Sequence, residues 1–306
     1  MNNTVDKQAA PLVSIIALNY NQTTVTCEFL ETTKQLTYRN FETIVVDNGS
    51  SIDPSAQIAA GNYPNLNLIL SPVNLGFTGG NNLGMQHASG DFVFIVNNDT
   101  EMTPDLIERL LAPFAEDPSI GVVCPKIRFY HHPNVIQYAG FHPMNLLTGR
   151  TWAVGSKEED NGQHNTSGPT HCAHGAAMMV KREVIDKVGR FADKFFIYYE
   201  ESDWSARILR AGYKIYYTAQ GLIYHKESIT MGKESPLKVY FHTRNRILYM
   251  RRNTNKQQLA VFLLFFSFLT FPKAVASYTL KGQFKHLKSF LKGTFWNFTN
   301  SSYSPV

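Results

Sequence analysis

The segment FIVNNDTEM, residues 94–102, joins an apolar run to a cluster of short polar side chains. Phe92–Val96 is typical of a buried strand, and Asn97–Asp99 follows it without a break. Short polar residues cap helices and form turns, and Pro104 suits the first turn of a helix. The carboxyl end of a strand in an open α/β sheet is also where ligands bind. The segment alone leaves both interpretations open.

The residues around this segment alternate between strand and helix patterns. The predicted strands of the first half are Leu12–Leu18, Phe41–Val46, Leu66–Leu70 and Asp91–Val96, and the predicted helices are Gln22–Leu36, Gly76 to His87 and Pro104–Phe114. Strands that alternate with helices predict an α/β fold with a mostly parallel sheet covered on both faces.

The second half has a looser pattern. Residues 150–170 are polar and contain glycine, which predicts a surface loop. The later elements are predicted as a strand at Ala176–Val180, helices at Lys181–Val188 and Asp203–Ala211, and short strands at Lys214–Thr218 and Leu222–Tyr224.

Composition limits the class of protein. The chain has 306 residues, 43% of them hydrophobic, which is enough for one large domain or two. Cys27, Cys124 and Cys172 are an odd number without a CxxC pair, so we expect no disulfide framework, no cysteine zinc site and a reduced, cytoplasmic setting. The start, MNNTVDKQAAP, lacks a basic segment, so we expect no signal peptide.

Charge is divided unevenly along the chain. Residues 226–306 contain 13 Lys and Arg against 2 acids, whereas residues 1–225 contain 16 against 22, and no acidic residue follows Glu234. This division predicts an acidic globular body with a basic appendage that binds an anionic surface. We expect that surface to be a membrane and not nucleic acid.

A cluster of polar residues follows each of three predicted strands. They are Asp47-Asn48-Gly49-Ser50, the loop from Gly76 to Asn82, and Asn97-Asn98-Asp99. The carboxyl ends of parallel strands share one edge of the sheet, so the clusters could meet at one ligand, and a Gly-rich loop before a helix suits phosphate. A dinucleotide-binding fold is not predicted, because the first strand ends in Asn19-Tyr20-Asn21 and not in a Gly-rich turn.

Six segments resemble, in order, the motifs of a known family. They are VSIIALNYN, VVDNGSS, NLGFTGGNN, FIVNNDTEM, HGAAMMVKREVIDKVGRF and FFIYYEESDWSARILRAG. Together they resemble the family-2 inverting glycosyltransferases with the GT-A fold, and most of all the bacterial rhamnosyltransferase-like members. The resemblance covers about residues 12–252 and implies a GT-A domain over 1–252, followed by a tail over 253–306.

The resemblance implies a site for a nucleoside diphosphate sugar. Asp47 would accept a hydrogen bond from the imide N–H of uracil or thymine, and an Asx turn with Asn48 and Gly49 is the alternative, although both can hold. Asn81 and Asn82 would lie along the ribose and diphosphate, with helix capping as the competing explanation. The full set of implied nucleotide-sugar residues is Asn19, Asp47, Gly76, Gly79, Asn81, Asn82, Asn97, Asn98 and Arg244.

Asn97-Asn98-Asp99 occupies the position of the family's Asp-x-Asp motif, which implies a divalent cation. Mg²⁺ or Mn²⁺ would stabilise the leaving diphosphate, bound by one or two protein carboxylates with phosphate oxygens and water. Asp99 would supply the carboxylate, and Asn97 stands where the motif has its first Asp. His225 would lie near the metal or the diphosphate, and a structural histidine is the alternative.

Glu200-Glu201-Ser202-Asp203 follows an aromatic run at the position where the family has its general base. Inversion requires a carboxylate that deprotonates the acceptor hydroxyl as it attacks the anomeric carbon. Glu201 matches that position, with Glu where Asp is usual, and Glu200 is the second candidate. The alternative is that these acids only favour the N-terminus of the following helix.

The basic C-terminal region has two further features. Arg244-Asn245-Arg246 could clamp a diphosphate, or it could belong to a solvated basic helix. Leu259–Phe271 is almost wholly apolar but ends before Pro272, so it is predicted to be too short to span a membrane. The residues that follow recur at helical spacing with lysines beside them, which predicts an amphipathic helix on a membrane surface or, as the alternative, one that docks on protein: Leu280, Lys281, Phe284, Lys285, Leu287, Lys288, Leu291, Lys292, Phe295 and Phe298.

The residues and the resemblance together predict a membrane-associated, metal-dependent inverting glycosyltransferase on the inner face of the plasma membrane. The first expectation is transfer of L-rhamnose from dTDP-rhamnose to a lipid-linked or polysaccharide acceptor in bacterial surface-glycan synthesis. The alternatives are another sugar from a UDP donor and a catalytically silent glycan-binding or scaffold relative, because Asn97 and Glu201 depart from the family pattern.

Overall fold

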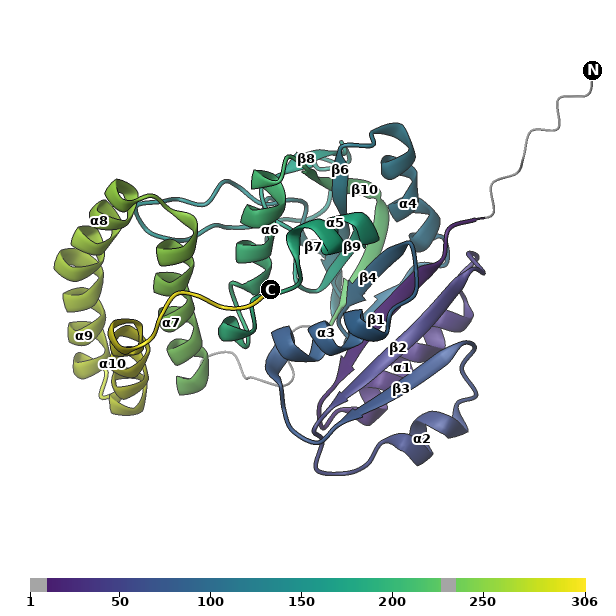
Figure 1. Cartoon of the computed structure of the whole chain (residues 1–306), viewed down its shortest axis with the longest axis horizontal. Helices are drawn as coiled ribbons and strands as arrows, with labels where there is room; N and C mark the ends of the chain where they lie inside the picture. The colour runs from purple at the N-terminus through teal and green to yellow at the C-terminus, as the bar shows by residue number, and fades with distance from the viewer. Residues whose placement is uncertain (1–9, 227–234) are drawn as a thin grey trace, which may run out of the picture.

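A computed structural model describes residues 10–226 and 235–306. Most of the N-terminal segment from which we predict the lack of a signal peptide therefore lies outside the described residues. The described chain forms a central sheet with helices on both of its faces, and a group of helices, α7 to α10, stands to one side of it (Figure 1).

The first half has the predicted alternation. Its elements are β1 (Val13–Asn19), α1 (Thr23–Lys34), β2 (Phe41–Asn48), α2 (Ser55–Ala60), β3 (Leu66–Ser71), α3 (Gly76–His87), β4 (Phe92–Val96), β5 (Thr100–Met102) and α4 (Leu106–Glu116). The side chains of β1, β2 and β4 are almost all buried, because helices cover both faces of these strands. This explains why these strands are continuous apolar runs without polar alternation.

The second half completes the sheet and adds the group of helices at its side. Its elements are β6 (Ile120–Phe129), β7 (His132–Tyr138), β8 (Gly168–Thr170), β9 (Ala177–Lys181), α5 (Arg182–Val188), a 3₁₀ turn (Asp193–Phe195), α6 (Glu200–Arg210), β10 (Lys214–His225), α7 (Pro236–Asn253), α8 (Lys256–Phe265), a π-helical turn (Phe266–Thr270), α9 (Phe271–Leu280) and α10 (Phe284–Thr299).

The strand order of the sheet is β3-β2-β1-β4-β9-β6-β10-β5. Neighbours from β3 to β4 run parallel, β9 is antiparallel to both β4 and β6, and β10 is parallel to β6. The predicted α/β class with a sheet flanked by helices is confirmed. The sheet is mixed, because the strands β5, β7, β8 and β9 pair antiparallel with their neighbours. The chain passes outward from β1 to β3 and returns to β4 on the other side of β1, so the reversal of strand order places a ligand crevice beside the carboxyl ends of β1 and β4.

Three local predictions differ from the structure. Helix α6 begins at Glu200 and not at Asp203, so its first turn contains the acidic pair. The two short strands predicted after it are one strand, β10, interrupted by an irregularity between Thr218 and Leu222. The polar segment 150–170 is not only a surface loop, because the side chain of Asp160 is 1% exposed and forms an ion pair of 2.9 Å with Lys126.

The apolar tail helix is longer than predicted. The chain stays helical from Lys256 to Leu280, a helix of 25 residues, and only 11% of its most apolar stretch is buried. Among the described residues, this helix alone is long and apolar enough to cross a membrane. Pro272 does not end the helix as predicted. The wider π-helical turn at Phe266–Thr270 lies just before it and accommodates the proline ring and the missing N–H of Pro272.

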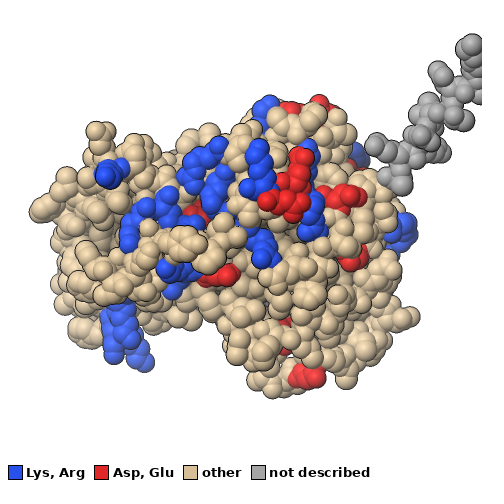
Figure 2. Space-filling view, in the orientation of Figure 1, with Lys and Arg blue, Asp and Glu red and all other residues tan. Residues whose placement is uncertain are grey.

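Helix α10 packs on α7 through small and polar side chains. Its buried residues, Phe290, Gly293, Thr294 and Asn297, follow helical spacing. Three other large apolar residues point away from the protein: Phe284, Phe295 and Phe298 are 65%, 56% and 79% exposed. Lys and Arg side chains are visible on the group of helices α7 to α10, whereas the acidic side chains gather over the part that contains the sheet (Figure 2). Both predicted alternatives therefore apply to α10: one of its faces docks on the protein, and another exposes an apolar stripe.

Candidate active site

The carboxyl ends of β1 and β2 are joined through Asn19 and Asp47. Asn19 is fully buried and donates from Nδ2 to Asp47 Oδ1 at 2.7 Å. Ser50 donates to the same carboxylate from its hydroxyl at 2.6 Å and from its backbone N–H at 3.1 Å. The turn predicted as the alternative for Asp47 is therefore present. A carboxylate has about four lone-pair sites, so these three bonds leave room for a further donor such as a base imide.

The same polar network reaches the end of β4. Thr26 of α1 donates to Asn19 Oδ1 at 2.8 Å and accepts from Asn98 Nδ2 at 2.8 Å. Asp47 and Asn98, which are 51 positions apart, are thereby linked across the point where the strand order reverses. The third predicted cluster joins the same edge, because Asn48 donates from Nδ2 to Gly76 O at 2.9 Å. Thr26 was not predicted, and no local sequence pattern distinguishes it.

Asp99 lies directly opposite His225, which ends β10. The distance from Asp99 Oδ1 to His225 Nε2 is 3.1 Å, and both side chains are largely buried. Despite this distance, Asp99 Oδ1 has no hydrogen-bond partner among the residues that the structure describes. Asn97 lies beside them, with its Nδ2 at 3.4 Å from His225 Nε2.

The orientation of His225 explains the missing hydrogen bond. Its Nδ1 lies 2.8 Å from Gln137 Oε1 on β7, an acceptor that requires Nδ1 to carry the proton. In the neutral ring the lone pair is then on Nε2, which lies 3.1 Å from Asp99 Oδ1 and 3.4 Å from the amide donor of Asn97. Two facing ligand atoms at 3.1 Å match an edge of an octahedron with metal–ligand bonds of about 2.0–2.2 Å. The pair thus has the donor atoms, spacing and outer hydrogen bond that suit Mg²⁺ or Mn²⁺.

No cluster of three or more His, Cys, Asp or Glu with metal-ligand spacing occurs in the described part of the chain. Mg²⁺ and Mn²⁺ sites that act on nucleotides commonly use only one or two protein ligands, because phosphate oxygens and water supply the rest. Asp99 and His225 therefore suffice for a site of that kind but not for a closed, purely structural metal site.

The Gly-rich loop and its asparagines make other contacts. Asn82 donates to Phe191 O at 2.9 Å and to Asp193 Oδ1 at 2.6 Å, and Asn81 donates to Phe77 O at 2.9 Å. Neither caps α3, whose N-cap position lacks a side-chain hydrogen bond. The contacts of Asn82 favour a role in holding the 190–193 segment, whereas Asn81 bonds within its own helix.

The two loop glycines allow close packing. Gly76 has φ +72°, and a Cβ there would lie 2.5 Å from Phe196, so the loop can approach the segment before α6 only with glycine. A Cβ at Gly79 would lie 2.8 Å from Leu75 Cβ. Both glycines remain nucleotide-site predictions, and their observed use is packing.

Glu200 and Glu201 occupy the first turn of α6, Glu200 buried and Glu201 partly buried. Burial raises the pKa of Glu200 well above its ordinary value, and the negative charge of Glu201 raises it further. Burial also raises the pKa of Glu201, but backbone hydrogen bonds and a hydrogen bond from Glu200 oppose this. Two carboxyls so close do not both ionise readily, so the pair shares a proton.

The segment Cys172–Ala176 connects α6, which contains the acidic pair, to the end of β4, where Asp99 lies. Its Ala173 N–H donates to Ser205 Oγ of α6 at 3.0 Å, and its Ala176 O accepts from the Asn97 N–H at 2.9 Å. His174 lies within this segment, with its ring 4.9 Å from that of Tyr138. The end of β4 and the first turn of α6 are therefore held by the same short stretch of chain.

Arg244 of α7 is turned into the protein. Its guanidinium donates to Lys194 O at 2.8 Å and to Phe195 O at 2.6 Å, and its Cζ lies 4.8 Å from the centre of the Trp296 ring. With 7% of its surface exposed, Arg244 supports the chain before the acidic pair. These contacts favour a structural role over the predicted diphosphate clamp and also exclude the alternative of a solvated residue.

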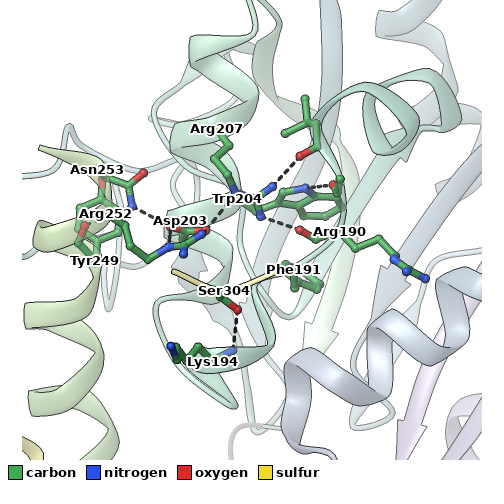
Figure 3. Close-up of polar contacts among 12 residues, drawn as sticks. Arg190, Phe191, Lys194, Asp203, Trp204, Arg207, Tyr249, Arg252, Asn253 and Ser304 are labelled. Carbon is green, nitrogen blue, oxygen red and sulfur yellow. Dashed lines mark hydrogen bonds and ion pairs between the residues drawn. The ribbon is translucent and has the colours of Figure 1, made fainter. Parts of the chain in front are cut away.

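Asp203 joins α6 to α7 in a buried ionic network (Figure 3). Its carboxylate receives Arg252 Nε at 2.8 Å, Arg207 Nε at 3.0 Å and Asn253 Nδ2 at 2.8 Å. Arg252 also donates to Ser302 O at 2.7 Å, which fixes the C-terminal segment across the two helices. Asp203 was predicted only as a helix-favouring acid, and its partners lie up to 50 positions away in the chain.

We expect Asp203→Ala to lower the free energy of unfolding by about 3–5 kcal/mol, because it leaves two buried arginines without their counter-ion. Burial alone would raise the pKa of Asp203, but the hydrogen bond from Arg252 and the charge of Arg207 lower it below its ordinary value. The carboxylate therefore stabilises the fold above about pH 4, and this contribution is lost as the pH falls through the lowered pKa.

Urea unfolding of wild type and Asp203→Asn between pH 2 and pH 7 measures this contribution. The stability difference between the two proteins should be largest near neutral pH and shrink toward pH 2. A difference that does not change with pH would contradict the ionic role of Asp203.

Two cavities of the described structure lie elsewhere. One of about 260 Å³ is lined by residues that include Phe141, His164 and Tyr217. A groove of about 490 Å³ between α7 and α10 is lined by Leu237, Tyr240, Ser289, Lys292 and Trp296. Neither contains a predicted site residue, so the chemistry of the strand ends, and not cavity size, identifies the candidate site.

An α/β sheet with a polar strand-end site, an Asp–His pair suited to a divalent cation and a buried acidic pair defines the class of GT-A glycosyltransferases. Comparison with known proteins agrees with this class. The profile of Glycosyl transferase family 2 matches residues 14–189, and the chain belongs to this family.

Several curated relatives are rhamnosyltransferases. The N-acetylglucosaminyl-diphospho-decaprenol L-rhamnosyltransferase of Mycobacterium tuberculosis is 24% identical over 263 residues, covering 78% of this chain and 84% of the relative. The O-antigen chain rhamnosyltransferase WbaN of Salmonella anatum is 26% identical, covering 76% of this chain and 71% of the relative. The predicted resemblance to rhamnosyltransferase-like members of the family is confirmed.

Solved structures share the fold at lower identity. The mannosyltransferase PcManGT from Pyrobaculum calidifontis, in complex with GDP-Man and Mn²⁺, has a TM-score of 0.59 and 16% identity, covering 95% of this chain and 88% of that one. S. aureus TarS 1–349 in complex with UDP-GlcNAc has a TM-score of 0.59 and 18% identity, covering 92% and 81%. The predicted GT-A fold and glycosyltransferase class are both confirmed.

Proposed function

We propose that this chain is an inverting, divalent-metal-dependent glycosyltransferase that moves a sugar from a nucleoside diphosphate to a lipid-linked or polysaccharide acceptor in bacterial cell-surface glycan synthesis. L-rhamnose from dTDP is the first candidate donor, on the strength of the rhamnosyltransferase relatives. We further propose that residues 1–252 form the transferase domain and that residues 253–306 form its membrane-associating tail.

The observation that carries this proposal is the facing pair Asp99 and His225, which have ligand atoms 3.1 Å apart and no hydrogen bond between them. Mg²⁺ or Mn²⁺ held there would neutralise charge that develops on the leaving diphosphate. Asn97 and Asn98 would line the same edge. Asp47 would accept from the base imide at the other end of the network that begins at Asn98.

The acidic pair would act on the acceptor. Glu201, as the ionised member, would take the proton of the acceptor hydroxyl while that oxygen attacks the anomeric carbon from the face opposite the diphosphate. Glu200, as the protonated member, would keep a second negative charge out of the site and hold Glu201 by a hydrogen bond. This assigns the base to Glu201 and a supporting role to Glu200.

A thermal-shift screen of nucleoside diphosphate sugars with Mn²⁺, followed by donor hydrolysis, tests the function. A ligand that binds only the native state raises the unfolding temperature by mass action. We expect dTDP-rhamnose to give the largest shift and to be turned over. A shift by UDP sugars alone would change the assigned donor, and binding without hydrolysis or transfer to any acceptor would support the catalytically silent alternative.

We also propose that α8–α10 attach the protein to the inner leaflet of the plasma membrane. The outward faces of α8 and the π-helical turn expose Val261, Leu264 and Phe268 at 52%, 59% and 74%, and α10 adds exposed phenylalanines. The other side of the long helix packs on the protein, since Phe266 and Phe271 both contact the ring of Phe290. A helix that is packed along one side suits a position in the interface of one leaflet, which we propose in place of a full crossing.

Four exposed lysines flank this apolar surface: Lys281, Lys285, Lys288 and Lys292. Each basic residue near an anionic leaflet is worth about 1 kcal/mol and is screened by salt. We therefore expect the fourfold Lys→Gln variant to bind phosphatidylserine-containing vesicles much more weakly than wild type at low salt, as measured by co-sedimentation.

The matched control changes four exposed lysines of the sheet-containing part to Gln: Lys34, Lys157, Lys187 and Lys214. It removes the same charge, so it should retain most of the vesicle binding. Equal binding by the two variants would mean that these tail lysines do not anchor the protein, and that the exposed stripe contacts another protein instead.

A further inference from the structure

The five residues before the acidic pair have an unusual backbone. Phe196, Tyr198 and Tyr199 have φ angles of +65°, +69° and +72°, in a region that large side chains rarely adopt. Ile197 N donates to Phe195 O at 2.7 Å, which closes a three-residue turn around Phe196. Such conformations cost on the order of 1–3 kcal/mol each and persist only where the surroundings enforce them.

Asn245 of α7 enforces this conformation. It is fully buried, and its Nδ2 lies 2.9, 2.7 and 2.8 Å from the carbonyl oxygens of Phe195, Ile197 and Tyr198. Arg244 fixes the direction of this amide, since its Nε donates to Asn245 Oδ1 at 2.8 Å while its Nη2 donates to Phe195 O. A single amide group therefore holds three carbonyls of the strained segment.

Helix α10 supports the other side of α7. Asn297 donates from Nδ2 to Arg244 O at 3.0 Å, and Trp296 lies over the guanidinium of the same residue. A Cβ at Gly293 would lie 2.6 Å from Tyr240 O, so the two helices are in close contact here. The contacts run without a break from the tail helix through α7 to Tyr198, two residues before Glu200.

We propose that Asn245 is a positioning residue that holds the 195–199 segment so that Glu201 points at the acceptor, and that α10 is the outer support of this arrangement through Asn297. The inference rests on the proposed function and deepens it, because it makes the tail part of the catalytic geometry and not only a membrane anchor. The Asp203 network joins α6 to α7 separately, so general docking of the two helices does not require Asn245.

We expect Asn245→Ala to lower kcat by roughly 10²-fold, the scale of loss when a catalytic group is displaced by about 1 Å. The KM for the donor and the Kd for the nucleotide with Mn²⁺ should stay as in wild type, because β1, β2 and β4 are untouched. The low-pH limb of the kcat profile should move to lower pH, since water would reach the acidic pair. Cys172, Tyr198 and Tyr199 interact with that pair and do not ionise in this range. His242, whose ring stacks on Tyr198 at 4.2 Å, does titrate near it, because burial lowers its pKa to about 4.

A milder pair of variants keeps the inference testable if Asn245→Ala does not fold. Asn297→Ala removes the bonds to Arg244 O and Gly293 O and the bond from Arg251 of α7. Asn300→Ala, at the C-cap of the same helix, removes side-chain bonds only to Trp296 O and Thr299. We expect Asn297→Ala to lose roughly two- to thirtyfold in kcat and Asn300→Ala to match wild type.

Hydrogen exchange of the amides of residues 195–201 provides a readout that does not need activity. Exchange should rise in Asn245→Ala and Asn297→Ala and not in Asn300→Ala. Wild-type kcat in both Asn245→Ala and Asn297→Ala, or unchanged exchange in both, overturns the positioning role. If wild type hydrolyses no donor while the exchange differences are present, the proposed function fails and the positional coupling stands.

Discussion

Replacing Glu201 with Gln is expected to lower turnover by roughly 10²–10⁴-fold, the usual contribution of a general base. The substitution keeps the size of the side chain and removes its ability to take the acceptor proton. Nucleotide affinity should barely change, because the base acts on the acceptor and not on the donor. Steady-state transfer assays with isothermal titration of the nucleotide separate the two effects.

Glu200→Gln is the matched control, since the neighbouring carboxyl holds the proton and a Gln imitates that neutral form. Its turnover should fall far less than that of Glu201→Gln. The raised pKa of the pair also predicts that wild-type kcat declines on the acid side well above pH 4, the range of an ordinary Glu. If Glu200→Gln shows the larger loss, the two roles are reversed.

Asp99→Ala should lower transfer by at least roughly 10²–10³-fold, because a divalent cation contributes several kcal/mol to a transition state that develops charge on a diphosphate. The variant should also lose the Mn²⁺-dependent increase in nucleotide affinity while it keeps the native circular dichroism spectrum. His225→Ala should show the same pattern to a smaller degree, since the carboxylate remains.

Asp105→Ala is the control for Asp99→Ala, because Asp105 lies on the surface and its ion pair is with Arg109. It should retain full turnover and the metal-dependent affinity. Gln137→Leu adds a test of the histidine orientation: without the acceptor at Nδ1, the apparent affinity for Mn²⁺ should fall by about 10- to 100-fold. Full wild-type activity in excess EDTA would falsify the metal role altogether.

The contacts of α7 show where sequence reasoning reached its limit. Arg244-Asn245-Arg246 was recognised as an unusual group of residues, and the available interpretations were a phosphate clamp or a solvated face. The partners of Arg244 and Asn245 are backbone carbonyls about 50 positions earlier, at Lys194 to Tyr198. A carbonyl is present at every position of the chain, so no residue type in the sequence marks these as partners.

The tail shows a related limit. A proline normally ends a helix, so the position of Pro272 predicts an apolar run too short to span a membrane. The preceding π-helical turn changes the local backbone and lets the helix continue to Leu280. Whether a proline ends or only adjusts a helix depends on what packs around it, and Phe266 and Phe271 pack on Phe290 from the next helix.

The sequence by itself determined the sheet, the alternation of strands and helices, the polar strand ends and the family. These features are encoded locally: apolar runs form strands, and Asn97–Asp99 is polar where the run of β4 stops. The tertiary structure alone decided how these parts act together. It placed His225 against Asp99 with Gln137 at its other ring nitrogen, buried Glu200 and Glu201 together so that the pKa of each is raised, and gave the strained segment before Glu201 its support from α7. Each of these features depends on two things: the distances between residues far apart in the chain, and burial that lowers the local dielectric constant. The identity of adjacent residues sets neither the distances nor the burial.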